Sequence, residues 1–218
     1  MKTQVNSNVT VIPKVEEEPF NSTYRRVGIM GGTFNPPHIG HLAIAEQVYE
    51  TLGLDAIHFM PTSEPGHTNG KTTINAEYRV DMLDYAIEDN PHFALDLTEV
   101  NRGGKTYTID TIKQLKEANP NTDYFFIIGG DMIEDLPNWK AIEELVTLVK
   151  FVGVNRPGYM PETDYSIIWI DTLDIDLSSS DIRQRVKEGL SIKYLTPDPV
   201  INYIEQKGLY LNEKSENN

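Results

Sequence analysis

The feature that most constrains the fold of this chain is the alternation of short apolar runs with longer helical patterns between residues 26 and 210. The apolar runs predict buried strands over residues 26–30, 56–60, 93–98, 124–128, 151–154 and 167–170. Apolar residues spaced three or four apart predict helices over residues 42–52, 80–87, 108–118, 141–148, 178–189 and 198–206. Such alternation predicts an α/β fold: a Rossmann-like, doubly wound, mostly parallel sheet with helices on both faces.

The two ends of the chain lack this pattern. Residues 1–25 show no sustained period and contain Pro13, Pro19 and a run of three glutamates, so we expect a disordered N-terminal extension. Residues 212–218 are expected to form a flexible tail. Residues 26–211 are then a single domain, and a chain of 218 residues is long enough to give it a proper core.

Composition excludes several classes of function. The formal charge is −14, from 19 basic and 33 acidic residues, and such a surface repels nucleic acid. The absence of cysteine excludes disulfides and thiolate metal sites. No apolar run approaches the length of a membrane span, and the N-terminus does not resemble a signal peptide, so a cytoplasmic protein is expected. The composition still allows the protein to bind a small phosphorylated ligand, provided that a local cluster of hydrogen-bond donors offsets the negative charge of the protein surface.

The first motif is GGTFNPPHIGH, at residues 31–41 between a predicted strand and a predicted helix. Gly31 and Gly32 lack a Cβ, so the backbone there can approach an anion closely. The helix that follows presents free N–H groups and a partial positive charge at its start. The segment therefore predicts a phosphate site, although it is neither a Walker loop nor a G-x-G-x-x-G turn.

His38 and His41 in this motif have three interpretations. A metal site is the first, but no third ligand stands at a convincing spacing, and zinc sites need at least three protein ligands. Turn and cap histidines without a chemical role are the second. The third is contact with a polyphosphate, to whose oxygens imidazoles can donate N–H bonds. The double glycine and the helix start favour the third interpretation.

The second motif, LSSSDIRQRV, predicts the start of a helix near the C-terminal end. Ser178 and Asp181 have the S-x-x-D spacing of a capping box. Ser179 and Ser180 stand at the same helix start, and Arg183 brings a planar fork of donors there one turn later. Alone, the motif could be an ordinary capped helix with surface arginines. Together with the histidine motif, it is better interpreted as the second half of a phosphate site.

Both motifs resemble those of the nucleotidyltransferase superfamily. GGTFNPPHIGH resembles its GGTFxPxHxGH signature, and LSSSDIR resembles its ISSTxIR motif, with Leu177 for Ile and Ser180 for Thr. Three further segments, TYTIDT, IIGGDMIEDLPNW and VNRPG, resemble the [ST]YTxDT, IIGxDxxxxLxxW and RPG segments of bacterial nicotinate-nucleotide adenylyltransferases. Their order and spacing also match, so that the resemblance covers nearly all of residues 26–210.

The resemblance implies that the chain transfers the adenylyl group of ATP to nicotinate mononucleotide, giving nicotinate adenine dinucleotide and pyrophosphate in NAD biosynthesis. The 5′-phosphate of the mononucleotide attacks the α-phosphorus of ATP in line, without a covalent intermediate. Because that nucleophile is already anionic, no general base is needed, and catalysis consists of positioning and charge stabilisation. The implied cofactor is Mg²⁺, bound mainly through ATP phosphates, with no protein metal site.

The resemblance also implies which residues form the site. The catalytic residues are His38, His41 and Arg183, which would neutralise the bridging and leaving phosphates. The ATP site is expected to comprise Gly31, Gly32, Thr33, Phe34, His38, His41, Gly129, Asp131, Arg156, Ser179, Ser180 and Arg183. The nicotinate mononucleotide site is expected to comprise Asn35, Thr106, Tyr107, Asp131 and Trp139.

The chemistry of several of these side chains suits a pyridine nucleotide. Trp139 offers a flat face for stacking a pyridine ring. Thr106 and Tyr107 precede a predicted helix start, whose N–H groups can receive a carboxylate. Asp131 can accept hydrogen bonds from ribose hydroxyls. Taken singly, Trp139 is equally well a core residue, and Asp131 a turn residue.

The chain departs from the family pattern in three places. The loop after the second predicted strand reads PTSEPGHTNGK where the family commonly has PxxxPPHK, so the sequence leaves open whether His67 or Lys71 closes over the substrate. Asn35 stands where Asp is common. The extension over residues 1–25 is not part of the usual enzyme.

Two alternative functions are compatible with the sequence. One is another nucleotidyltransferase of the superfamily, of the cytidylyl or phosphopantetheine type. The other is a non-catalytic nucleotide sensor, which would bind nucleotide without releasing pyrophosphate. A tRNA synthetase agrees less well with the sequence than either alternative, because the chain is short and acidic for binding tRNA. A homo-oligomer is compatible with the sequence, and the strictness of the preference for nicotinate over nicotinamide is left open.

Overall fold

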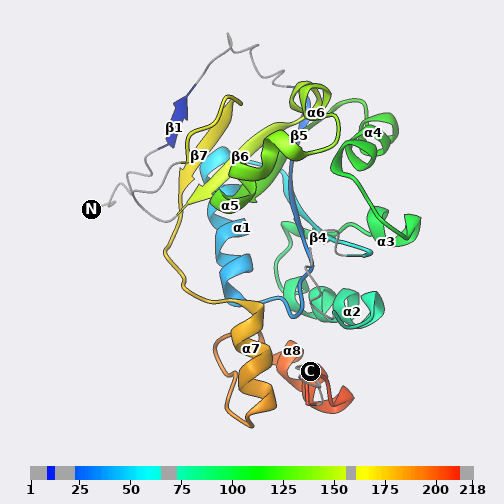
Figure 1. The fold of residues 1–218 in the computed structure, drawn as a ribbon, viewed down its shortest axis with the longest axis vertical. Helices are drawn as coiled ribbons and strands as arrows, with labels where there is room; N and C mark the ends of the chain where they lie inside the picture. The colour runs from blue at the N-terminus through cyan, green and yellow to red at the C-terminus, as the bar shows by residue number, and fades with distance from the viewer. Residues whose placement is uncertain (1–8, 13–22, 65–72, 156–160, 212–218) are drawn as a thin grey trace.

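The computed structural model describes residues 9–12, 23–64, 73–155 and 161–211, and a mostly parallel sheet lies at its centre (Figure 1). In these residues the strand order is β1-β7-β6-β5-β2-β3-β4. All neighbouring strands run parallel except β1, which runs antiparallel to β7. The strands are β1 (Val9–Ile12), β2 (Arg25–Gly32), β3 (Ala56–Pro61), β4 (Phe93–Leu95), β5 (Thr122–Gly129), β6 (Lys150–Asn155) and β7 (Ile167–Asp171).

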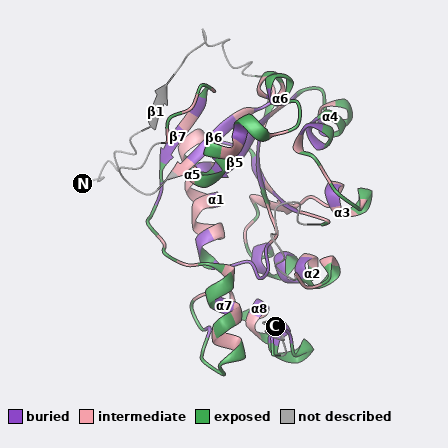
Figure 2. Cartoon of the chain, viewed as in Figure 1, coloured by how far each residue is buried: buried purple, intermediate pink, exposed green. Residues whose placement is uncertain are grey.

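Helices cover both faces of the sheet, which confirms the predicted doubly wound α/β fold. One apolar cluster joins the sheet to α1, α2, α7 and α8, and a second joins its other face to α4, α5 and α6. Figure 2 shows the buried residues concentrated in the strands and on the inner sides of these helices. The helices are α1 (Ile39–Leu52), α2 (Ala76–Ile87), α3 (Thr98–Arg102), α4 (Thr108–Ala118), α5 (Gly130–Asp135), the 3₁₀ turn η1 (Leu136–Asn138), α6 (Ile142–Leu148), α7 (Ser179–Lys187) and α8 (Asp198–Lys207).

The apolar runs of the sequence form strands that are buried on both sides. In β2, Val27 and Ile29 belong to one cluster and Met30 to the other. Successive side chains of a strand point to opposite faces, so a central strand between two helical layers needs apolar residues at nearly every position.

Most predicted elements are confirmed, but the chain after β4 differs. The predicted strand over residues 93–98 is too long, since β4 ends at Leu95. The Asp96 carboxylate accepts the N–H of Thr98 at 2.9 Å, and this bond turns the chain into α3. Helices α3 and α5 were not predicted, because elements of five or six residues are too short to show a helical period.

The N-terminal extension also differs from the expectation of a segment without structure. Val9–Ile12 adds a strand to the sheet edge beside β7. The remaining residues of the extension up to residue 22, and the tail over residues 212–218, lie outside the described residues. Within the described part of the chain, no helix is both long enough and apolar enough to cross a membrane.

The strand order reverses beside β2. From β2 the chain adds β3 and β4 on one side, and it later adds β5, β6 and β7 on the other. In open parallel sheets, ligands bind beyond the carboxyl ends of the strands at such a reversal. Here those ends are Gly32 of β2 and Gly129 of β5.

Candidate active site

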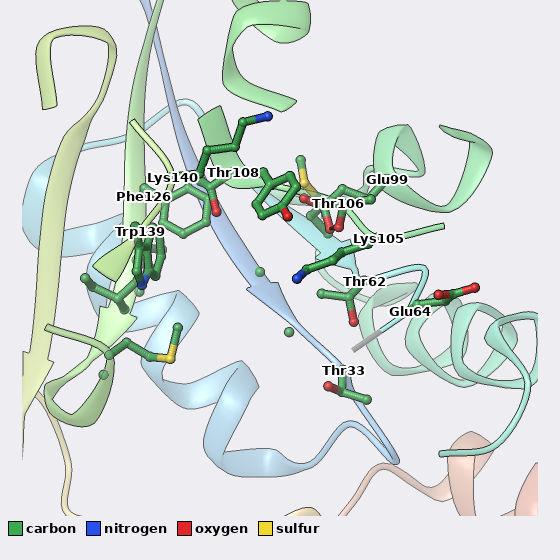
Figure 3. A pocket seen from close by; sticks show the side chains of 18 of the residues that line it. Thr33, Thr62, Glu64, Glu99, Lys105, Thr106, Thr108, Phe126, Trp139 and Lys140 are labelled. Atoms are coloured by element: carbon green, nitrogen blue, oxygen red, sulfur yellow. Dashed lines mark hydrogen bonds between the residues drawn. The ribbon is translucent and has the colours of Figure 1, made fainter. Parts of the chain in front are cut away.

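A cavity of about 560 Å³ opens at this reversal, within the size range of small-molecule sites (Figure 3). Figure 3 shows Phe126 and Trp139 on one side of it, and Thr62 and Lys105 on the other. The predicted site residues that line the cavity are Gly31, Gly32, Thr33, Thr106, Tyr107, Gly129 and Trp139. The structure therefore brings together segments that the sequence places far apart.

The two histidines form a stacked pair at the start of α1. His38 is the N-cap residue, and its ring lies 3.7 Å from that of His41, centroid to centroid. The backbone N–H of His38 donates to Nδ1 of His41 at 3.2 Å. A neutral His41 therefore carries its proton on Nε2, where it is available as a donor. Gly40 makes the stack possible, because a Cβ there would lie only 3.0 Å from Nδ1 of His38.

Both imidazoles are neutral at physiological pH. Burial lowers the pKa of His38 from 6.5 to about 4, although the nearby Asp181 carboxylate acts in the opposite direction. Burial and the neighbouring His38 lower the pKa of His41 to about 3. A polyphosphate beside the rings would supply the negative charge that favours protonation.

These lowered pKa values predict that polyphosphate binding takes up protons. A bound anion favours the charged imidazole, so the pKa of His38 and His41 rises and the complex holds more protons than the free protein near pH 6. Calorimetric titration of MgATP in two buffers with different ionisation enthalpies would measure this uptake. Equal binding enthalpies in the two buffers would contradict it.

The same shifts predict how stability depends on pH. The unfolded histidines have a pKa near 6.5, so the unfolded chain binds more protons than the folded one from pH 6.5 down to about 4 for His38 and down to about 3 for His41. The contribution of these two groups to the free energy of unfolding is present above pH 6.5 and is lost as the pH falls through this window. A series of urea unfolding curves would show whether the His41→Ala variant depends less steeply on pH there than the wild-type protein.

The start of α7 is hydrogen-bonded directly to the histidine turn, a contact that the sequence did not predict. The Ser179 hydroxyl donates to the Pro36 carbonyl at 2.7 Å. Arg183 donates through Nη1 to the Asn35 carbonyl at 2.8 Å and through Nη2 to the Ser180 hydroxyl at 3.2 Å. The Ser179 hydroxyl thus donates its hydrogen bond to the protein backbone and not to a ligand. The two halves of the expected phosphate site nevertheless lie together.

The expected catalytic residues His38, His41 and Arg183 lie beside the cavity wall but do not line the cavity, and neither do Ser179 and Ser180. Three further expected site residues also do not line it. Asn35 is 4% exposed, and its amide oxygen accepts the Tyr210 hydroxyl at 2.9 Å, so its side chain belongs to the core. Phe34 is also buried and packs its ring edge-on against His41, with centroids 5.1 Å apart. Asp131 is exposed in the first turn of α5. The remaining expectations, for Arg156, His67 and Lys71, lie outside the described residues.

Trp139 is both a packing residue and a cavity residue. Its ring meets Phe126 and Phe151 edge-on, each at 6.0 Å between centroids. Its indole Nε1 is buried without a hydrogen-bond partner among the described residues. The interpretation of Trp139 as a core residue is therefore confirmed in part, and the residue also forms part of the cavity wall. Stacking of a pyridine ring on Trp139 stays a prediction.

Two lysines at the cavity were not singled out from the sequence. The Nζ atoms of Lys140 and Lys105 lie 4.5 Å and 5.2 Å from the centre of the Tyr107 ring. Lys140 also pairs with Asp110 at 2.8 Å. Each lysine is next to a motif that the sequence analysis had identified: Lys105 precedes TYTIDT, and Lys140 follows Trp139. This position beside a motif could have indicated that the two lysines belong to the site. They give an acidic protein a local positive charge at the cavity.

Glu99 is a further cavity residue that the sequence did not indicate. It is buried, and its carboxylate accepts the hydroxyls of Thr106 at 2.9 Å and Thr111 at 3.0 Å. These bonds fix the segment that leads into α4. In the part of the chain that the structure describes, no side chain caps this helix at its N-cap residue, Tyr107. Glu99 lies in α3. Because the sequence did not predict this helix, it also did not predict which of the helix's residues face the cavity.

Comparisons with known proteins show the family to which the chain belongs. The cytidylyltransferase-like family matches residues 29–185. A protein of Enterococcus faecalis named "Probable nicotinate-nucleotide adenylyltransferase" is 52% identical over 91% of this chain and 91% of its own length. A protein of the same name from Lactiplantibacillus plantarum is 52% identical over 86% of this chain and 89% of its own.

A solved structure shares the fold. The Plasmodium falciparum nicotinic acid mononucleotide adenylyltransferase complexed with NaAD superimposes with a TM-score of 0.71 at 24% identity, over 86% of this chain and 98% of that one. The family match covers more than half of the chain, and relatives with about half their residues identical match almost end to end. The chain therefore belongs to the cytidylyltransferase-like family and, within it, to the nicotinate-nucleotide adenylyltransferases.

Proposed function

We propose that this chain transfers the adenylyl group of ATP to nicotinate mononucleotide, giving nicotinate adenine dinucleotide and pyrophosphate. The observation that carries the proposal is the continuity of the cavity wall with the histidine turn. Gly31, Gly32 and Thr33 line the cavity, and the same chain runs on into the His38–His41 pair. In this proposal, a nucleotide in the cavity extends its phosphates past this wall toward the stacked imidazoles and α7.

The chain's own residues supply charge stabilisation and orientation. His41 donates from Nε2, while the bond between its Nδ1 and the His38 N–H holds the ring in place. Arg183 can direct its guanidinium at the departing pyrophosphate, since one edge of it is anchored on the Asn35 carbonyl. The attacking phosphate needs no general base. Donors held in place before the reaction stabilise the charge that develops during it.

The mononucleotide end of the cavity suits an anionic pyridine. Trp139 offers its ring for stacking, and no side chain of the described residues caps the start of α4 at Tyr107. The N–H groups at that helix start can therefore receive the nicotinate carboxylate. Lys105 and Lys140 add positive charge beside it. This arrangement favours nicotinate over neutral nicotinamide.

Mg²⁺ enters this proposal with ATP, as part of the substrate complex. Among the described residues, no group of three or more His, Cys, Asp or Glu side chains is arranged to hold a metal ion. In this proposal, phosphate oxygens and water hold the ion, which offsets phosphate charge. We propose the cytoplasm, which supplies ATP, as the working compartment.

A nucleotide screen tests the proposal against its two rivals. With nicotinate mononucleotide as acceptor, we expect pyrophosphate release and nicotinate adenine dinucleotide formation with ATP, and no comparable turnover with CTP. Preference for CTP, or transfer to phosphopantetheine instead, would identify a different transferase. Thermal stabilisation by ATP with no pyrophosphate release from any pair would identify a nucleotide sensor.

Trp139→Leu is expected to raise the KM for nicotinate mononucleotide by about tenfold, with little change in the KM for ATP. Stacking of a base on an aromatic ring contributes on the order of 1–3 kcal/mol, and leucine lacks the flat face. Trp139→Phe, which keeps an aromatic ring, is the matched control and should stay close to the wild-type KM. Equal KM values for the leucine and phenylalanine variants would exclude stacking by Trp139.

A further inference from the structure

Arg79 in α2 is a buried cation that neither motif contains. It is 1% exposed, and among the described residues no carboxylate forms an ion pair with it. Its guanidinium is held by backbone carbonyls: Nη1 donates to Thr33 at 2.9 Å, Nη2 to Thr62 at 2.8 Å and to Ser63 at 2.9 Å, and Nε to Ile74 at 3.3 Å. Burying a charge is unfavourable unless such bonds compensate for it, so this arrangement calls for an explanation.

The four carbonyls belong to three separate segments of the chain. Thr33 follows β2, Thr62 and Ser63 follow β3, and Ile74 precedes α2. Thr33 and Thr62 both line the cavity, and the N–H of Thr62 donates to the Gly32 carbonyl at 2.9 Å. One planar group therefore sets the spacing between two neighbouring parts of the cavity wall.

We propose that Arg79 is a positioning residue for adenylyl transfer, which holds the turn after β2 at a fixed distance from the segment after β3. The first of these segments leads into the histidine pair, and the second forms the facing part of the cavity. The inference rests on the proposed function for its effect on catalysis, but the geometry it describes exists without substrate.

Lysine cannot replace arginine in this role. The guanidinium is a rigid fork with five N–H donors, four of which are engaged here on separate carbonyls. An ammonium group has three donors at a single point, so it leaves at least one of the four carbonyls without a donor from this side chain. Arg79→Lys keeps the positive charge and the length of the side chain while removing the fork, so it separates positioning from charge.

The test compares Arg79→Lys with Arg25→Lys, which makes the same change at an exposed position at the far end of β2. We expect Arg79→Lys to raise the KM for nicotinate mononucleotide and to lower kcat, each by about tenfold, since small displacements of substrate-positioning groups have effects of this order or larger. Arg25→Lys should match the wild-type protein. Loss of folded protein alone would lower the maximal rate and leave KM unchanged, so an unchanged KM would overturn the proposal.

Hydrogen exchange provides a measurement that does not depend on catalysis. We expect the amide of Thr62 to exchange at least about tenfold faster in substrate-free Arg79→Lys than in the wild-type protein, because the segment is no longer tied. Unchanged exchange would overturn the proposal. If the wild-type protein failed to release pyrophosphate, the proposed function would fail, whereas this readout would still decide the role of Arg79.

Chemical rescue covers the case in which lysine does not fold. Methylguanidinium added to Arg79→Ala should refill the site, raise the melting temperature and lower the KM toward the wild-type value. A rise in melting temperature with no recovery of KM would show that Arg79 stabilises the fold without positioning the site.

Discussion

His41→Ala is expected to lower kcat by about a hundredfold or more while the protein stays folded. The variant loses the Nε2 donor that the structure holds ready, and removal of one such preorganised donor typically costs on the order of a hundredfold to a thousandfold in kcat. Most of the packing around the site persists, because His41 lies at the partly exposed start of α1 and not in the sheet. Steady-state pyrophosphate release, with circular dichroism as the check on folding, measures both effects.

His41→Gln is the matched control for the structural part of this change. Glutamine at the third position of a helix can accept the N–H of the N-cap residue, as Nδ1 of His41 does here. It should restore the melting temperature without restoring kcat. Near-normal turnover in His41→Ala would show that the His41 ring does not take part in the phosphate chemistry. Its role would then be limited to capping the start of α1.

Arg183→Lys should have an effect of similar size, a loss of about a hundredfold in kcat. Arg183 uses one edge of its fork on the Asn35 carbonyl and so joins α7 to the histidine turn. Lysine keeps the charge but cannot hold this carbonyl and approach a phosphate with the same planar geometry. Arg185→Lys on the same helix, where Nε bonds only the Ser191 carbonyl near the surface, is the control. A loss of equal size in both variants would contradict a specific role for Arg183.

The framework of the site was predictable from the sequence because it depends on local patterns. Apolar runs such as the one before Gly31 predicted the central strands, and helix starts were indicated by the GGTFNPPHIGH and LSSSDIR segments. Parallel strands place their carboxyl ends at one edge, which was enough to predict that Gly129 and the double glycine meet. Thr106 was placed at the site only by the family resemblance, and it does line the cavity.

The parts that could not be predicted depend on contacts between residues far apart in sequence. Arg183 and Asn35 are 148 positions apart, and no local pattern indicates that one binds the other's carbonyl. The burial of the Asn35 amide against Tyr210 has the same origin. Arg79 stands in an ordinary helical pattern, and only the folded chain shows its four carbonyl partners.

The measurement that tests the central claim most directly is pyrophosphate release with MgATP and either nicotinate mononucleotide or nicotinamide mononucleotide, side by side. We expect rapid release with the acid and a rate at least about tenfold lower with the amide, because a hydrogen bond to a charged group contributes about 1.5–3 kcal/mol. Equal rates would keep the adenylyl transfer but remove the carboxylate site at Thr106 and Tyr107. No release with nicotinate mononucleotide would contradict the proposed function itself.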